Sequence, residues 1–304
     1  MNRNKAIGCL YGQLIGDALG TRYEFLSAVN TQAKIKKDLD SKQQFLPILG
    51  GGPFKMTPGQ ITDDSEMAFS LAASLCRCKS FNAPDVACAY VAWQQSTPPD
   101  IGVATRNALE IKSRLPSNWI DTLDAKAKCA VHKEVIENVR QHNADSASNG
   151  CLMRISPIAI ASAHLSVDKM KEMVREDCIL THCAPVCIDA VTAYVAAVRE
   201  LINDRTPLEA FKAAVEISQN DTVKDILRCA KREAIPVKAR GVLINGDTKM
   251  MGYIGVALQS AFHELLNAPS FYTGLLNAVS RGGDTDTNGC IVAAMLGRSF
   301  LELL

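Results

Sequence analysis

Apolar side chains recur every three or four residues along most of the chain, which is the spacing of amphipathic helices. In residues 4–20, for example, Ile7, Leu10, Leu14 and Ala18 share one stripe. No segment shows the strict alternation of a half-buried strand, and no internal repeat occurs. The pattern therefore predicts an all-α fold in a single domain that spans residues 1–304. The predicted helices are 4–20, 63–78, 84–94, 103–113, 123–141, 207–218, 221–232, 251–267, 270–279 and 289–302, with two more that follow Pro157 and Ser166.

Three stretches lack this periodicity and are predicted to be loops: residues 28–60, 114–122 and 236–248. The first is mixed in composition and rich in turn residues, including the run from Gly50 to Pro53. Long loops within a domain are often functional. Since this one leads into an acidic cluster that begins at Thr62, we expect it to border a functional site.

The segment RGGDTDTNGC, from Arg281 to Cys290, interleaves carboxylates and hydroxyls. Its glycines allow tight turns, so that alternate side chains aim oxygens at one point. Such oxygen-only clusters suit hard cations such as Mg²⁺, Mn²⁺ or Ca²⁺. A turn that merely caps the following helix is the alternative. The candidate metal ligands here are Asp284, Asp286 and Thr287.

An EF-hand loop is excluded for this segment. Asp284, Asp286, Asn288 and Gly289 match the first half of such a loop, but its last position requires a glutamate that binds through both oxygens. That position is Met295. The remaining ligands must therefore come from elsewhere in the chain.

A second cluster, Thr62, Asp63 and Asp64, opens another apolar segment that runs from Met67 to Leu75. Acidic residues at a helix start also interact favourably with the helix dipole, so a capped helix is again the alternative. Two oxygen-rich clusters at opposite ends of one chain are better explained by a shared site. We expect them to converge on a binuclear metal centre, on loops at helix ends, of the kind that polarises oxygens on both sides of a reacting bond.

Composition narrows the class of protein. The chain is 47% hydrophobic and 21% charged, and its net charge is +1, so that no strong field favours nucleic acid or an anionic membrane. No run of about 18 apolar residues predicts a membrane span, and no apolar signal-peptide core precedes Asp17. The eleven cysteines show no disulfide or zinc spacing, which favours free thiols in a reducing, cytoplasmic compartment.

Other motifs are less decisive. His263-Glu264 begins a zincin pattern, but Asn267 stands where the second histidine belongs. The chain has neither a Gly-x-Ser-x-Gly elbow nor a Walker A loop. His182 is either a core histidine or a functional one. The turn from Ser148 to Arg154 is either ordinary or a nest of N–H groups for a phosphate.

Five segments, in order, resemble the ADP-ribosylglycohydrolases, the family that includes the glycohydrolase that reactivates dinitrogenase reductase. The Thr-Asp-Asp and Gly-Gly-Asp-Thr-Asp-Thr segments are highly specific, and the other three support them. The five segments are Gly16–Glu24, Thr62–Met67, Asp100–Thr105, Ser148–Pro157 and Gly282–Thr287.

The resemblance implies an orthogonal, multi-helix all-α domain with two divalent cations, Mg²⁺ or Mn²⁺. It implies that Thr62, Asp63 and Asp64 bind on one side and Asp284, Asp286 and Thr287 on the other, with Asp286 a candidate bridge. Further implied roles are a catalytic, mobile-loop carboxylate for Glu24, a diphosphate-binding loop for Ser148, Asn149, Gly150 and Met153, and positions near the ADP-ribose for His182 and near the ribose for Gly102. Asp63, Asp64, Asp286 and Glu24 are the implied catalytic residues.

The implied activity is hydrolysis of the bond between ADP-ribose and a modified protein side chain, most simply arginine, by a monomer. Hydrolysis of another linkage, such as serine-linked ADP-ribose, O-acetyl-ADP-ribose or the polymer, remains open, as does a non-catalytic role in binding ADP-ribose. Two departures from the family pattern stand out. Ala147 replaces an aromatic residue that stacks on adenine in some members, and the chain stops soon after Phe300.

Overall fold

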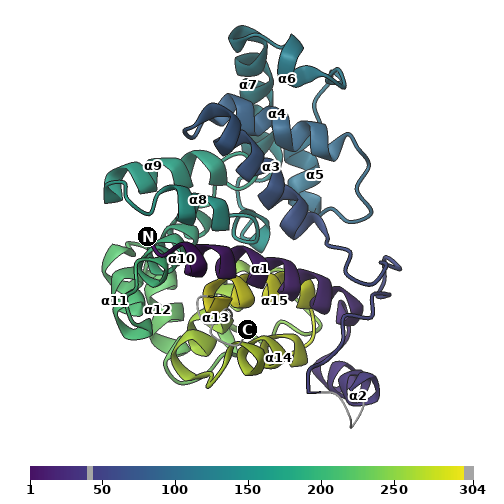
Figure 1. The fold of residues 1–304 in the computed structure, drawn as a ribbon, viewed down its shortest axis with the longest axis vertical. Coiled ribbons are helices and arrows are strands. Elements are labelled where there is room, and N and C mark those ends of the chain that lie inside the picture. Colours follow the sequence, from purple (N-terminus) through teal and green to yellow (C-terminus); the bar gives the residue numbers. More distant parts are fainter. Residues whose placement is uncertain (40–43, 298–304) are drawn as a thin grey trace.

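The computed structural model describes residues 1–39 and 44–297. Its core is the pairing of α1 (Arg3–Gly20) with α15 (Thr285–Leu296), the first and last helices, which lie side by side in Figure 1. All residues of α15 are buried, because α1, α13 (Ile254–Asn267) and α14 (Phe271–Ser280) surround it. Beyond its polar first turn α15 is apolar on every side, and such a helix belongs in an interior position.

Glycines bring the backbones of α1 and α15 into direct contact. A Cβ atom on Gly12, Gly16 or Gly20 would lie 2.2 Å from a backbone carbonyl oxygen of the partner helix. The small residues on one face of α1 therefore fix its position along α15. This contact carries the end of α1 to the first turn of α15, where the Gly-Gly-Asp-Thr-Asp-Thr segment lies.

The other helices lie above, beside and below α1 in the view of Figure 1. The upper group consists of α3 (Asp63–Cys78), α4 (Ala83–Gln94), α5 (Val103–Leu109), α6 (Trp119–Thr122) and α7 (Ala125–His142). To the side lie α8 (Ser156–Ala161) and α9 (Val167–Cys178). Below lie α10 (Pro185–Ile202), α11 (Pro207–Ile217), α12 (Asp221–Ala230), α13 and α14, with α2 (Ala28–Asp38) at the edge. The predicted all-α fold is confirmed.

Several predicted boundaries were wrong. Residues 28–60 are not all loop, since they contain α2, whose buried stripe is only Thr31 and Ile35. The 103–113 helix ends at Leu109, and the 114–122 loop contains the single turn α6. Within the predicted loop 236–248, β1 (Val237–Ala239) and β2 (Val242–Ile244) form an antiparallel hairpin.

The last helix begins at Thr285 rather than at residue 289, so Asp286 and Thr287 lie in its first turn and not on a loop. Asp63 and Asp64 likewise lie in the first turn of α3. The predicted end of the last helix, beyond residue 297, falls outside the described residues. A peptide N–H that is not used within the helix is available only in this first turn, which explains why polar groups gather there.

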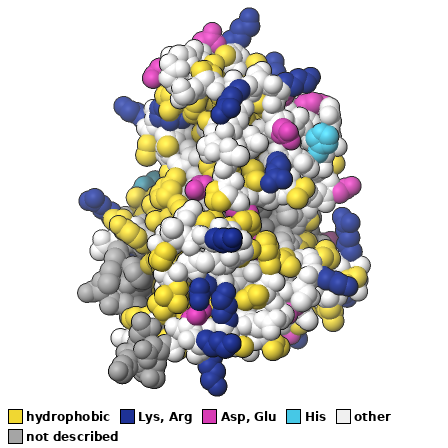
Figure 2. Space-filling view, turned by 90° about the vertical axis from the view of Figure 1, so that its right-hand side faces the viewer, with side chains coloured by type: hydrophobic (Ala, Val, Ile, Leu, Met, Phe, Trp, Pro, Cys, Tyr) yellow, Lys and Arg dark blue, Asp and Glu magenta, His cyan; other side chains and the backbone are white. Residues whose placement is uncertain are grey.

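The eleven cysteines are all free thiols, as predicted, and six of them are buried. None of the helices in residues 1–39 and 44–297 combines the length and hydrophobicity that crossing a membrane requires. On the face shown in Figure 2, lysines and arginines are spread from top to bottom, with acidic side chains between them.

Candidate metal centre and substrate cleft

A cleft of about 670 Å³ receives residues from both ends of the chain. Its walls come from the segment after α1, the start of α3, the α5 region, the loop after α7 and the start of α15. The structure thus brings together segments that are far apart in the sequence. Of the predicted site residues, those lining the cleft are Glu24, Asp63, Gly102, Ser148, Asn149, Gly150, Met153, Asp284, Asp286 and Thr287.

Asp17 of α1 holds the start of α3 in place. Its carboxylate accepts hydrogen bonds from the Thr62 N–H (3.1 Å), the Thr62 hydroxyl (2.9 Å) and the Ser65 N–H (3.2 Å). A carboxylate that accepts N–H groups at a helix N-terminus acts as its cap. Asp17 therefore caps α3 from another helix and leaves the side chain of Asp63 free to line the cleft, whereas Asp64 is buried and does not line it.

The start of α15 is tied to the same two helices. Thr285 Oγ1 donates to Gly20 O at the end of α1 (2.7 Å). Thr287 Oγ1 donates to Asp64 Oδ1 at the start of α3 (3.1 Å). Both acidic clusters are thereby joined through α1 into one site.

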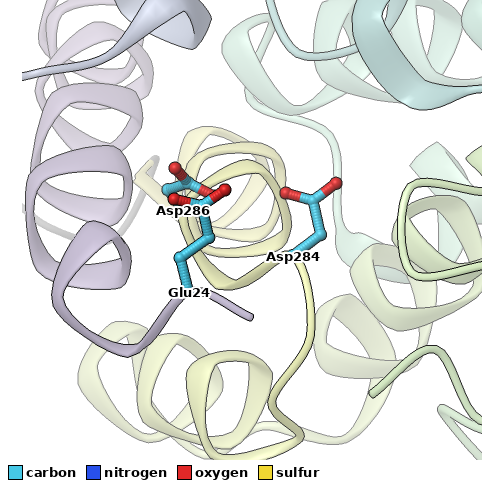
Figure 3. A group of neighbouring side chains, drawn as sticks. All are labelled: Glu24, Asp284 and Asp286. Atoms are coloured by element: carbon cyan, nitrogen blue, oxygen red, sulfur yellow. The ribbon is translucent and has the colours of Figure 1, made fainter. Parts of the chain in front are cut away.

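Three carboxylates form the tightest group in this site. One oxygen from each of Glu24, Asp284 and Asp286 lies within 4.8 Å of the others. Figure 3 shows Glu24 extending toward Asp286, with Asp284 facing them. A set of oxygen atoms at this separation is suited to a hard divalent cation.

Two buried oxygens in the site support the same conclusion. Glu24 Oε2 and Asp64 Oδ2 have no hydrogen-bond donor, although buried carboxylate oxygens normally have one. None of the ion pairs found in residues 1–39 and 44–297 compensates Glu24, Asp63, Asp64, Asp284 or Asp286. The donor set therefore fits divalent cations bound by oxygen.

Burial and mutual repulsion perturb the ionisation of these groups. Burial, followed by the charges of Asp100 and Asp284, raises the pKa of Glu24 to about 9. Burial is also the main cause that raises the pKa of Asp63, Asp64 and Asp286 well above its usual range. Without a cation, the site therefore retains protons that a bound cation would displace.

The loop after α7 closes the other end of the cleft. Ser148 Oγ lies 2.6 Å from His182 Nε2, and Thr181 Oγ1 lies 2.9 Å from His182 Nδ1. His182 is fully buried, so it supports Ser148 from behind rather than lining the cleft. His182 is therefore a core residue with both ring nitrogens in contact with hydroxyls, and its role near the ADP-ribose stays a prediction.

Arg154 fixes the same loop from inside the protein. It is completely buried and donates to Gly150 O (2.9 Å) and Thr181 Oγ1 (2.8 Å). Asp177 compensates its charge at 3.1 Å. An ion pair with these extra hydrogen bonds can exist in a dry interior. The Ser148–Met153 turn is therefore a rigid wall of the cleft.

Sequence reasoning did not assign two aspartates that belong to the site. Asp17 was given no role from the sequence, and its hydrogen bonds to Thr62 and Ser65 at the start of α3 reveal its function. Asp100 lines the cleft, and its pKa is raised to about 6, mainly by burial and then by Asp284. Both lie inside the segments that carried the family resemblance, which was the available signal.

Comparisons with known proteins agree with this architecture. The chain is 26% identical to the ADP-ribosylarginine hydrolase Tri1 of Serratia proteamaculans, over 97% of this chain and 72% of the relative. It is 23% identical to the ADP-ribosyl-[dinitrogen reductase] glycohydrolase of Rhodospirillum rubrum, over 98% and 86%. A solved ADP-ribosylglycohydrolase-related protein complex shares the fold, with a TM-score of 0.69 and 23% identity over 97% of this chain and 87% of that one. Residues 1–299 match the model of the ADP-ribosylglycohydrolase family, and the chain therefore belongs to this family.

Proposed function

We propose that this protein, as one domain over residues 1–304, is a metal-dependent hydrolase that removes ADP-ribose from modified arginine side chains of proteins. The observation that carries this proposal is the convergence of Glu24, Asp284 and Asp286 in the cleft. Asp64, which is hydrogen-bonded to Thr287 of the same cleft, adds an oxygen without a hydrogen-bond donor. The arginine linkage is supported by the name of the Serratia relative.

The proposed ligands of two divalent cations, Mg²⁺ or Mn²⁺, are the residues at the starts of α3 and α15. They are Thr62, Asp63 and Asp64 on one side, and Asp284, Asp286 and Thr287 on the other. Such cations supply positive charge that orients ribose hydroxyls and lowers the pKa of a bound water. The Thr62 hydroxyl donates a hydrogen bond to Asp17, so the lone pairs of the Thr62 oxygen point away from Asp17.

The reaction adds water across the bond between the anomeric carbon and the arginine nitrogen. The C–N bond breaks as the carbon becomes oxocarbenium-like, the water oxygen bonds to that carbon, and the released guanidine takes a proton. We assign acceptance of the proton of the attacking water to Glu24, Asp63, Asp64 and Asp286. Glu24, Asp63 and Asp286 line the cleft, whereas Asp64 is buried in the first turn of α3. The products are ADP-ribose and unmodified arginine.

The rest of the cleft positions the nucleotide. We assign the diphosphate to the turn that contains Ser148, Asn149, Gly150 and Met153, with His182 behind it. Gly102 leaves open space beside the ribose, since a Cβ there would meet nothing within 4 Å. Contacts remote from the scissile bond can contribute to catalysis by holding the sugar in its reactive orientation.

A second hydrolase function, on another ADP-ribose linkage, differs only in the leaving group. A non-catalytic protein that binds ADP-ribose is the alternative from a different class. We further propose a monomer that acts in a reducing cytoplasm, which the eleven free cysteines support.

Release of ADP-ribose from four substrates tests the assignment: arginine-modified protein, serine-modified protein, O-acetyl-ADP-ribose and the polymer. Each is incubated with Mg²⁺, with Mn²⁺ and with chelator. The proposal predicts metal-dependent release that is fastest from arginine. Faster release from another substrate would reassign the linkage. If ADP-ribose binds but is released from none of them, the protein is a binding relative rather than a hydrolase.

A further inference from the structure

Glu24 is held in the site by its neighbours along the chain. Phe25, which follows it, has a φ of +62°, a conformation that a bulky residue rarely adopts. Two hydrogen bonds maintain it: Phe25 N–H donates to Gly283 O, and Gly283 N–H donates to Leu26 O, both at 2.8 Å. A strained backbone of this kind persists only where surrounding contacts over-determine it.

On the other side of Glu24, the chain is fixed by α2. Arg22 donates to both oxygens of Asp38, through Nε at 2.7 Å and Nη2 at 2.8 Å. The Tyr23 hydroxyl donates to Asp38 as well, at 2.9 Å. Tyr23 is completely buried, and the Asp38 side chain is only 10% exposed. One carboxylate therefore receives three hydrogen bonds from the two residues that precede Glu24.

Asp38 lies at the C-terminal end of α2, where a negative charge destabilises a helix. It is the last residue of α2, where the helix dipole favours positive charge. The stability of α2 therefore does not explain an aspartate at this position. The guanidinium of Arg22 explains it, because a bidentate pair between guanidinium and carboxylate is strong and fixes geometry.

The helix that carries Asp38 is itself hydrogen-bonded to segments near the C-terminal end of the chain. The Ala28 N–H donates to Asp247 Oδ2 (3.2 Å), and Gln32 donates to Ser280 O of α14 (3.3 Å). Lys34 Nζ donates to the carbonyl oxygen of Arg22 (2.7 Å). Asp38 thus holds Arg22 and Tyr23 from a helix that is itself hydrogen-bonded to other parts of the protein.

We propose that Asp38 is a positioning residue that sets the carboxylate of Glu24 against Asp284 and Asp286 through Arg22 and Tyr23. Asp38 does not line the cleft. Asp38 affects the reaction only by placing Glu24. The expected loss of activity therefore rests on the proposed function, whereas the expected change in the geometry of the acidic group does not.

The matched variants are Asp38→Asn and Asp85→Asn. Asp85 is also a buried carboxylate with three donors, Ser74, Arg77 and Lys128, but its partners all lie in the upper group of helices. Both substitutions remove one carboxylate charge at nearly constant volume, which breaks the ion pair with Arg22 for Asp38 and those with Arg77 and Lys128 for Asp85. We expect Asp38→Asn to lower kcat by about tenfold, with KM changed less than about threefold, because displacement of a catalytic group affects the reaction more than binding. Asp85→Asn is expected to leave kcat and KM unchanged.

A readout without turnover separates this inference from the proposed function. Binding of Mn²⁺ alone, measured by its electron paramagnetic resonance signal, is expected to weaken several-fold in Asp38→Asn and in Glu24→Gln, but not in Asp85→Asn. If Asp38 acts through Glu24, the double variant binds Mn²⁺ no more weakly than Glu24→Gln alone. Amide exchange at Phe25 is expected to accelerate in Asp38→Asn, because its hydrogen bond to Gly283 loosens.

Independent, additive losses of Mn²⁺ affinity in the double variant would overturn the inference. So would equal effects of Asp38→Asn and Asp85→Asn on kcat or on Mn²⁺ affinity. If Asp38→Asn does not fold, Tyr23→Phe and Arg22→Lys each remove part of the hydrogen bonding to Asp38. Smaller losses of Mn²⁺ affinity and of kcat are then expected. Unchanged Mn²⁺ affinity in both of these variants would also contradict the inference. A wild-type protein that binds Mn²⁺ but releases no ADP-ribose would reject the proposed function and leave this test intact.

Discussion

The side-chain amide of Asn149 donates a 2.8 Å hydrogen bond to Asp284 Oδ2. The bond links the turn assigned to the diphosphate with the acidic segment at the start of α15. Asn149 is itself held in place by its backbone N–H, which donates to Gly252 O (2.9 Å). The turn around Asn149 and the acidic segment around Asp284 are therefore connected, and a substitution in one is expected to affect the other.

Loss of this bond is expected to destabilise the metal-free protein. Asn149→Ala removes the donor and leaves a carboxylate that other acids repel, which we expect to lower the free energy of unfolding by about 1–2 kcal/mol. Asn138→Ala is the control, since its amide donates only to the carbonyls of Ala108 and Glu110 at the edge of α7. Urea unfolding in chelator measures both. A loss in Asn149→Ala that Mg²⁺ fails to change would argue against any link between Asn149 and the metal centre.

Repulsion among the acids predicts opposite effects of one substitution on the metal-free and metal-loaded forms. Asp286→Asn puts a neutral amide in place of an acid whose ionised form is disfavoured by burial and by Glu24, so the chelated protein is expected to melt at a higher temperature than wild type. The same variant loses a ligand, so the increase in melting temperature that Mn²⁺ gives the wild type is expected to disappear. A variant that melts lower in chelator, or keeps the full Mn²⁺ effect, would contradict this description of the site.

The contact between α1 and α15 makes Gly16 intolerant of any side chain. A Cβ there would lie 2.2 Å from Gly289 O, and backbone cannot yield as a side-chain tip can. Gly16→Ala is expected to cost about 3 kcal/mol or more of the free energy of unfolding, the upper range for overpacking. Gly102→Ala is the matched variant, since its Cβ meets nothing within 4 Å. Thermal melts should show a large loss for the first and almost none for the second, and equal losses would refute the packing argument.

Asp85 predicts a pH dependence of stability in a part of the protein remote from the cleft. Burial alone would raise its pKa, but hydrogen bonds from Arg77, Lys128 and Ser74 outweigh burial and lower the pKa to about 2. An unfolded aspartate has a pKa of about 3.9, so the folded state is favoured above that pH, and this contribution is lost as the pH falls toward 2.

The difference between wild type and Asp85→Asn isolates that contribution. We expect the variant to be less stable by about 2–3 kcal/mol at neutral pH, because it leaves two cations without their partner. The difference is expected to hold down to about pH 5 and to shrink between pH 4 and 2. Urea unfolding of both proteins across this range measures it. A difference that does not change with pH would mean that the charge of Asp85 is irrelevant.

The sequence predicted most of the helices with wide apolar stripes and the two acidic clusters, but the 18-residue helix α10 was not among the predicted ones. The prediction also failed where the local signal is weak. In α2, only Thr31 and Ile35 are buried, a stripe too narrow to distinguish a helix from a polar loop. The strands β1 and β2 have three residues each, too few to show a period of two.

The site itself depends on contacts that no local pattern contains. Asp17 becomes a cap only because the α1–α15 packing brings it to the start of α3. The support of Glu24 by Asp38 depends on α2, which the sequence did not reveal. Individual charged and hydrogen-bonding residues of the site could be recognised from the sequence. Which of them contact one another follows only from the tertiary structure.

The most direct test of the account is release of ADP-ribose from arginine-modified protein as Mg²⁺ is removed and restored. It compares wild type with Asp286→Asn, and with Asp168→Asn, which removes an exposed acid from the first turn of α9. We predict that chelation stops release by wild type, that Mg²⁺ restores it, and that only Asp286→Asn stays inactive throughout. Release that continues in chelator, or that Asp286→Asn supports as well as wild type, would contradict the metal centre on which the account rests.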